Sequence, residues 1–361
     1  MNARPAPLPT AGAPSAAPAP SAPDSAFPEN PVVVRVWRDR SVESVHRGAW
    51  CLVDSAGTVL EGVGAYDAPF FVRSSVKSIQ ALPLFESGAA ERFAFRDEEV
   101  ALAIASHSGE PCHTEVVHRT LERLGLGVRH LRCGAHAPTD DAAREVLRVR
   151  GEAATVLHNN CSGKHAGFLA LAKHLGAPAE AYLEPDSEGQ RLVRAALAEL
   201  AGVPESTLVP GIDGCSAPTY RLPLSALALA FARVANPEGL GEERARHFRR
   251  MTAAAARHPV LVGGSVKRID TELLRASGGR LFAKIGAEAV HAIGVVGGDR
   301  ALAVKIDDGG ARALHALVVG LLGHLGRASA AELAQLSSSL RERTLQNFAG
   351  LEVGRIEPVL G

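Results

Sequence analysis

The stretch Arg73-Ser74-Ser75-Val76-Lys77 carries a serine followed three residues later by a lysine. If this stretch opens a helix, the Ser74 hydroxyl and the Lys77 amine lie on one face, a single turn apart. A serine hydroxyl becomes a nucleophile when a neighbouring base takes its proton, and a lysine that burial has stripped of its charge is such a base. The stretch therefore predicts a helix start with Ser-Lys chemistry. Its plainer interpretation is a capping serine beside a solvated lysine.

The composition is that of a globular protein without a strong charge. Hydrophobic residues make up 46% of the 361 residues, and 39 Lys and Arg balance 39 Asp and Glu, so no field steers nucleic acid or an anionic membrane. We expect a small-molecule substrate. Residues 1–31, rich in Pro and Ala, predict a disordered tail with no signal-peptide core. No later segment is apolar over the length of a membrane span, and five scattered cysteines indicate reduced thiols, so we expect a cytoplasmic protein.

Runs of strand and helix character divide the remainder into three parts. Strands are expected at both ends and helices between them. This order predicts an α+β fold in one domain, residues 32–361, whose antiparallel sheet is built from N- and C-terminal strands, with terminal helices on one face and a helical block on the other. The expected strands are 32–37, 49–54, 58–63, 280–284, 289–295 and 301–306. The expected helices are 97–105, 115–124, 140–149, 163–175, 188–201, 224–234, 242–256, 270–276, 310–325 and 329–340.

A serine-rich loop and a late lysine are the second and third candidate elements. Ser106, His107 and Ser108 follow an expected helix, where small hydroxyl groups relay a proton or hold a substrate carboxylate and His107 titrates near neutral pH. Lys284 ends an expected strand before Gly286, which lets the backbone approach a bound anion. The plainer interpretations are a polar helix end with a turn, and a solvated lysine.

The order Ser-x-x-Lys, serine-rich loop, Lys-x-Gly resembles that of the penicillin-recognising serine enzymes. Here the second element reads Ser-His-Ser instead of Ser-Asp-Asn, and the third reads Lys-Ile-Gly instead of Lys-Thr-Gly. The expected arrangement of strands and helices is likewise that of serine β-lactamases and penicillin-binding proteins. By this analogy the active site lies where the sheet meets the helical block.

Two glycine-rich turns carry a fourth group of candidates. Cys161 and Cys215, with Lys164 or His165, have the donor atoms for a soft divalent metal such as zinc. Their spacing is not that of a zinc finger, and two lone cysteines are more often packed thiols. Asp213 either orients Lys164, binds a substrate amine, or is a turn residue before a glycine.

Six runs, in order, resemble the rhizobial-type, or class 3, L-asparaginases. The resemblance extends from about residue 32 to the C-terminus and implies a β-lactamase-like fold, hydrolysis of L-asparagine to aspartate and ammonia, and a homodimer. The runs are His46-Arg47-Gly48, Arg73-Ser74-Ser75-Val76-Lys77, Ala105-Ser106-His107-Ser108-Gly109-Glu110, Asn160-Cys161-Ser162-Gly163-Lys164-His165, Asp213-Gly214-Cys215-Ser216-Ala217-Pro218 and Ala283-Lys284-Ile285-Gly286-Ala287-Glu288.

The resemblance also implies roles for particular residues. The family's nucleophile and base fall on Ser74 and Lys77, its second serine on Ser106 and its distant lysine on Lys284. The family's zinc ligands fall on Cys161, Lys164 and Cys215. In that family the metal supports substrate binding and does not take part in the chemical step.

We therefore expect acyl transfer, in which Ser74 attacks the side-chain amide of asparagine and ammonia leaves after protonation through Ser106 and Lys284. Which serine is attacked first stays open, because each has a lysine partner. Three residues near these motifs are expected to bind the substrate: Arg73, His107 and Asp213. Arg73 would bind the α-carboxylate, and Asp213 would pair with the α-ammonium.

Three alternative functions remain open. A glutaminase or a penicillin-interactive serine hydrolase shares the Ser-Lys chemistry. A cysteine hydrolase built on Cys161 and His165 is a second alternative. A non-catalytic amino-acid-binding protein is the third, and it would bind asparagine without releasing ammonia.

Overall fold

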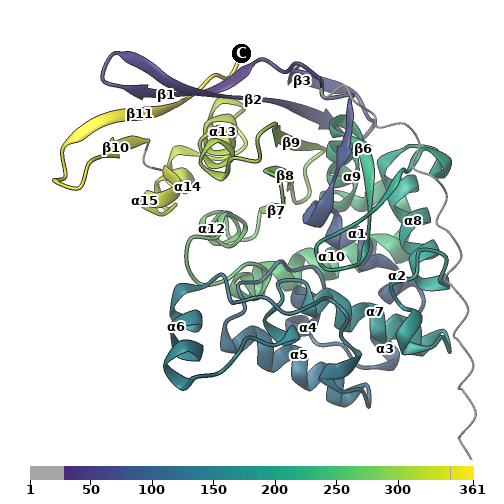
Figure 1. Cartoon of the computed structure of the whole chain (residues 1–361). Coiled ribbons are helices and arrows are strands. Elements are labelled where there is room, and N and C mark those ends of the chain that lie inside the picture. Colours follow the sequence, from purple (N-terminus) through teal and green to yellow (C-terminus); the bar gives the residue numbers. More distant parts are fainter. Residues whose placement is uncertain (1–27, 342) are drawn as a thin grey trace, which may run out of the picture.

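The computed structural model describes residues 28–341 and 343–361. Its main sheet has the strand order β10-β11-β1-β2-β9-β8-β7, with β3 paired to β2, and the pairs are antiparallel (Figure 1). The strands are β1 (Val32–Arg38), β2 (Ser41–Asp54), β3 (Val59–Val63), β7 (Leu281–Gly286), β8 (Val290–Val295), β9 (Arg300–Ile306), β10 (Thr344–Gln346) and β11 (Glu352–Pro358). N- and C-terminal strands thus share one sheet, which confirms the predicted fold class.

The inner part of β2 shows why the sheet lies between two layers. Residues 48–53 are all buried, and their side chains alternate between two cores. Trp50 and Leu52 belong to the core under α13 (Ala311–His324), whereas Cys51 and Val53 belong to the core of the helical block, where α9 (Leu224–Ala235) packs on β2, β8 and β9. Because both faces of the sheet are covered here, side chains on both sides of β2 are buried, and the strand has a continuous apolar run although it is antiparallel.

The helical block fills the chain between the two groups of strands and lies against one end of the sheet (Figure 1). The block consists of η1 (Arg73–Val76), α1 (Lys77–Gln80), α2 (Leu82–Glu86), α3 (Ala89–Arg92), α4 (Asp97–Ala103), α5 (Pro111–Arg123), α6 (Asp141–Arg150), α7 (Ser162–His174), α8 (Glu188–Ala201), α9, α10 (Glu242–Arg257), α11 (Pro259–Val262) and α12 (Ile269–Ala276). Two short members in sequence, η1 and α1, carry the Ser-x-x-Lys motif.

A small sheet next to the block was not predicted. Its strands are β4 (Pro69–Phe71), β6 (Pro218–Pro223) and β5 (Pro210–Ile212), with β6 in the middle. Because β4 runs directly into η1 and β5 ends next to Asp213, this sheet brings the Ser-x-x-Lys motif beside a loop 140 residues further along the chain.

Three local predictions differ from the structure. The segment around Ser74, η1, is a 3-10 turn that begins at Arg73. The α-helix starts only at Lys77 and ends at Gln80, before α2 with Pro83 in its first turn. The single helix expected over 329–340 is two short ones, α14 (Ala330–Ala334) and α15 (Ser338–Arg341), although the Ser329 capping box is present. Strands β10 and β11 were not expected at all.

The N-terminal tail predicted over 1–31 lies mostly outside the described residues, since the description begins at residue 28. Asn30, within the predicted tail, is buried: its side chain donates to Asp307 and accepts from the Ala65 N–H. The anchored part of the chain therefore starts before β1. Across 28–341 and 343–361, none of the helices combines the length and apolar character that crossing a membrane requires.

Candidate active site

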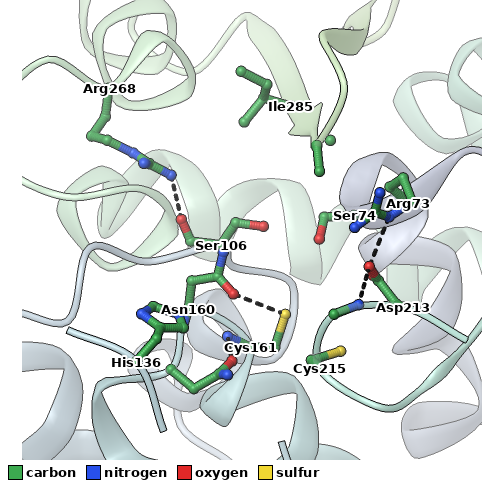
Figure 2. A pocket seen from close by; sticks show the side chains of 14 residues that line it. Arg73, Ser74, Ser106, His136, Asn160, Cys161, Asp213, Cys215, Arg268 and Ile285 are labelled. Carbon is green, nitrogen blue, oxygen red and sulfur yellow. Dashed lines mark hydrogen bonds and ion pairs between the residues drawn. The ribbon is translucent and has the colours of Figure 1, made fainter. Parts of the chain in front are cut away.

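A pocket of about 370 Å³ opens where β7, η1 and several loops meet (Figure 2). Such a volume suits a small ligand. Six of the predicted site residues line it, and three buried lysines lie behind them. The lining residues are Arg73, Ser74, Ser106, Cys161, Asp213 and Cys215. The lysines are Lys77, Lys164 and Lys284.

The Ser-x-x-Lys turn is held close to the end of β7. Gly286 makes this possible, since a Cβ there would lie 3.0 Å from the Val72 carbonyl oxygen and 3.2 Å from the Ser75 nitrogen. Arg73 has φ +50°, a left-handed conformation that costs a non-glycine residue about 1–3 kcal/mol. Ser74 is half-buried and points into the pocket, toward Ser106 (Figure 2).

Ser106 lies between two buried amines. Lys77 Nζ and Lys284 Nζ are each 2.9 Å from Ser106 Oγ. Lys77 also donates to the Ala105 carbonyl at 2.5 Å, and no hydrogen bond joins it to Ser74 within residues 28–341 and 343–361. Among the described residues, both lysines thus hydrogen-bond the second serine, Ser106, and not Ser74. The Lys284 contact joins residues 178 positions apart, so the spacing of the motifs could not predict it.

The Ser106 backbone is also fixed. Its N–H donates to the Val262 carbonyl, and its own carbonyl accepts from Arg268 at 2.5 Å. Val262 ends α11 and Arg268 directly precedes α12, so the loop after α4 is held by a part of the chain that follows it by about 160 residues.

Lys284 is prepared to exchange a proton near neutral pH. Burial lowers its pKa to about 7, with the charges of Lys77 and Arg268 acting in the same direction and the carboxylate of Asp270 opposing them. Asp270 Oδ2 lies 3.6 Å from Lys284 Nζ. An amine with this pKa is largely neutral just above pH 7, where it accepts a proton from a serine hydroxyl.

Arg73 and Asp213, the two predicted anchors of a substrate amino acid, contact each other. Arg73 Nε donates to Asp213 Oδ1 at 2.7 Å at the edge of the pocket (Figure 2). Burial alone would raise the pKa of Asp213, but the cations of Lys164 and Arg73 outweigh it and lower that pKa. The pocket therefore presents one fixed cation and one fixed anion side by side, which matches the two ends of an amino-acid zwitterion.

The Cys161 and Cys215 thiols lie within hydrogen-bonding reach of each other. Their hydrogen bond is the main cause that lowers the pKa of Cys161 well below its ordinary value and that raises the pKa of Cys215. Lys164 Nζ lies 3.3 Å from Cys215 Sγ. Burial works against the charge of Lys164, but the two sulfur atoms and Asp213 outweigh it and raise its pKa. Two thiols and one amine thus converge in a buried cluster.

The two histidines singled out from the sequence, His107 and His165, are both buried away from the pocket lining. His107 is fully buried and does not line the pocket; its Nδ1 accepts from the Gly109 N–H, its Nε2 bonds Ser162 Oγ, and its ring stacks on His113. His107 therefore does not face the pocket, and its contact with the substrate stays a prediction. His165 bonds Tyr182 through Nδ1, and its buried Nε2 has no hydrogen-bond partner among the described residues.

Four residues of the site escaped sequence reasoning as functional candidates. Arg268, His136 and Asn160 line the pocket, and Asp270 is the carboxylate behind Lys284. The Asn160 amide oxygen accepts from Cys161 at 3.2 Å. Among these four, the sequence pattern singled out only Asp270, as a carboxylate at the start of a predicted helix. The pattern did not indicate which lysine Asp270 would contact.

Comparisons with known proteins agree with these observations. The sequence profile of the L-asparaginase II family matches residues 34–358. A comparison with curated proteins found no match. Among solved structures, a chain of Mglu in its native form is similar with 14% identity and a TM-score of 0.43, over 78% of this chain and 61% of that one. A beta-lactamase from Mycobacterium bovis is similar with 18% identity and a TM-score of 0.40, over 76% and 93%.

Both structural similarities are weak, with TM-scores of only 0.43 and 0.40. This chain spans about three fifths of the length of the Mglu chain. The profile, in contrast, covers nearly all of the described residues and confirms the predicted resemblance to asparaginases. The chain therefore belongs to the L-asparaginase II family, a family of amidohydrolases.

Proposed function

We propose that this protein hydrolyses L-asparagine to L-aspartate and ammonia by acyl transfer to a serine. The observation that carries the proposal is the Ser106 hydroxyl, which lies at a pocket wall with two buried lysine amines at 2.9 Å. A hydroxyl with one proton and two amine neighbours is activated best when one amine is charged and the other is neutral.

In the proposed reaction, neutral Lys284 takes the proton of Ser106, and Ser106 Oγ attacks the side-chain amide carbon of asparagine. The charged amine of Lys77 stabilises the developing alkoxide. The C–N bond then breaks, ammonia leaves with a proton returned by Lys284, and a β-aspartyl ester remains on Ser106. Water hydrolyses this ester with Lys284 again as base. Ser74, across the pocket, donates a hydrogen bond to the oxyanion, a role that exchanges the order of the two serines expected from the sequence.

Arg73 and Asp213 are proposed to recognise the α-carboxylate and the α-ammonium of the substrate. Their mutual ion pair at 2.7 Å holds both side chains in place before binding, which lowers the entropy cost of recognition. Every α-amino acid carries these two charged groups, so the two contacts alone do not select asparagine. The length of the side chain that places its amide at Ser106 determines which amino acid is hydrolysed.

Substrate choice is tested by a side-by-side assay of asparagine, glutamine and a chromogenic β-lactam. We expect ammonia release from asparagine at the highest kcat/KM. A higher value with glutamine, or turnover of the β-lactam alone, would replace the proposal by a glutaminase or a penicillin-interactive hydrolase. The homodimer that the family resemblance implies is part of the proposal, and sedimentation of the purified protein tests it.

The pH dependence of turnover is expected to follow Lys284. Since Lys284 acts as a base in its neutral form and its pKa is about 7, kcat/KM should fall by about tenfold per pH unit on the acid side of that value. The profile is recorded with asparagine between about pH 5 and about pH 9. In Lys284→Met the residual activity should lose this acid limb, whereas a wild-type profile that stays flat through pH 7 would contradict the assignment.

A zinc ion is proposed at the thiol cluster. The donor set of Cys161, Cys215 and Lys164 fits a soft divalent metal, and the hydrogen bond with Cys215 lowers the pKa of Cys161, which favours the thiolate form that binds such a metal. Across the described residues no group of three or more His, Cys, Asp or Glu side chains forms a metal site, so the lysine amine is needed as third ligand, after it loses its proton. The ion would supply positive charge near the bound substrate.

The metal prediction is tested by elemental analysis and by two variants. Protein purified without chelator should contain about one zinc per chain. Cys161→Ala and Cys215→Ala should lose this metal and raise KM for asparagine more than they lower kcat, because the ion serves binding. Cys112→Ala is the matched control, since Cys112 is an exposed thiol away from the pocket, and it should change neither quantity. Metal-free protein of full activity would contradict the site.

A further inference from the structure

Asp270 is a buried carboxylate directly behind the proposed base. It lies in the first turn of α12, is 2% exposed, and contacts three groups. Its Oδ2 accepts from the Ile285 N–H at 3.0 Å and lies 3.6 Å from Lys284 Nζ, and its Oδ1 accepts from His291 Nε2 at 2.8 Å. These partners leave the carboxylate without contact to the pocket, so it is not itself a substrate ligand.

The backbone contact fixes the strand that carries Lys284. In the described sheet β7 is the last strand of the order, and β8 pairs with it on one side only. The Ile285 N–H that points away from β8 would otherwise lack an acceptor, which is costly inside a protein. Asp270 supplies this acceptor at the residue next to Lys284 and thereby sets the position of its side chain.

The histidine contact fixes the carboxylate. Because Asp270 accepts from Nε2, His291 carries its proton there, and its Nδ1 is buried with no hydrogen-bond partner among the described residues. Burial alone would raise the pKa of Asp270, but Lys284 and His291 outweigh it and hold that pKa far below its ordinary value. Asp270 is therefore an anion near neutral pH.

Among the charges around Lys284, the Asp270 carboxylate favours the protonated amine. Burial and two cations disfavour the ammonium form of Lys284, and Asp270 is the main group that favours it. Further from Lys284, His315 on α13 faces the Asp270 and His291 pair. The groups that face Lys284 and Asp270 from the neighbouring elements are Lys77, Cys161, Arg268, His291 and His315.

We propose that Asp270 is a positioning residue of this site, whose carboxylate, held by the Ile285 N–H and His291, keeps the Lys284 amine against Ser106 and balances its proton affinity so that it both accepts and returns a proton. The proposal rests on the proposed function only for its catalytic consequence. A base that is too weak takes the serine proton inefficiently, and one that is too strong does not return it to the leaving group.

The direct test is a titration of Lys284 that needs no substrate. The chain has six lysines, so protein labelled with ¹³C at lysine Cε gives few signals, and the signal missing from Lys284→Met identifies Lys284. In the wild type this signal should titrate near pH 7. In Asp270→Asn, which keeps the shape and an acceptor for Ile285, the midpoint should move down by about one pH unit or more. An unchanged midpoint would overturn the proposal.

A matched control and a second variant sharpen this result. Asp307→Asn removes a partly buried carboxylate that favours the ammonium of Lys305 but does not act on Lys284, so it should move only the Lys305 signal. Asp270→Ser is smaller, cannot crowd the site, and still offers an oxygen to the Ile285 N–H. It should reproduce the shift seen with Asp270→Asn, and a Lys284 midpoint equal to the wild type in this variant would likewise overturn the proposal.

Kinetics then connect the shift to catalysis. The acid limb of kcat/KM for asparagine should move down by the same amount in Asp270→Asn, and the plateau should fall by about tenfold or more. A purely structural role would lower the plateau without moving the limb. If the wild type released no ammonia from asparagine, the proposed function would fail, while the NMR titration would still decide the role of Asp270.

Discussion

Ser106→Ala is expected to lower kcat/KM for asparagine by about three orders of magnitude or more while the protein stays folded. Ser106 is the hydroxyl within 2.9 Å of both Lys77 and Lys284, so its removal eliminates the acceptor of the acyl group and leaves the two amines without the atom that they activate. Turnover is measured as ammonia release, and circular dichroism checks the fold.

The control for this variant is Ser108→Ala in the same loop. The Ser108 hydroxyl is buried and donates to Glu110 at 2.5 Å, outside the pocket that holds Ser106. It should keep turnover within a few-fold of the wild type. A Ser106→Ala protein that retains more than about a tenth of the wild-type activity would rule this serine out as the nucleophile.

Ser74→Ala is expected to lower kcat by about two to three orders of magnitude with a smaller change in KM. Ser74 has no hydrogen bond to Lys77 but points toward Ser106 across the pocket, where its hydroxyl reaches charge that develops during the attack (Figure 2). The loss of one such donor has this cost in serine hydrolases. Ser75→Ala is the matched control, because the neighbouring Ser75 hydroxyl donates to the Val72 carbonyl at 2.6 Å inside the protein.

Mass spectrometry of the two variants mixed with asparagine separates the serines. Ser74→Ala should still accumulate a β-aspartyl adduct, found on the peptide that contains Ser106, and Ser106→Ala should form none. The opposite pattern, an adduct on Ser74 that persists in Ser106→Ala, would restore the order expected from the sequence and make Ser106 the proton relay.

The fold was predictable where local patterns and burial agree. Helix α8 was expected at its observed bounds, and the Ser329 capping box is present, because both depend on neighbours along the chain. Strands β10 and β11 were missed because their pairing with β1 comes from the tertiary fold, as in Val36 opposite Ile356. The single helix expected over 329–340 failed for a similar reason, since the turn at Ser337 bonds the distant Glu272 side chain.

The site was predictable in its membership but not in its contacts. The motifs and the family resemblance identified the residues that line the pocket, except for Arg268, His136 and Asn159. A spacing of three residues suggested that Lys77 serves Ser74, but the 3-10 turn and the approach of the loop after α4 bring Lys77 to Ser106 instead. Asp270 depends on the same kind of long-range packing, because only the folded chain brings α12 to the edge of β7.

Ammonia release from L-asparagine by the purified wild-type protein tests the central claim most directly. The account predicts that ammonia and aspartate appear in equal amounts, that release weakens below about pH 7, and that Ser106→Ala under the same conditions releases almost none. Folded wild-type protein that binds asparagine but liberates no ammonia would contradict the account and leave an amino-acid-binding protein in its place.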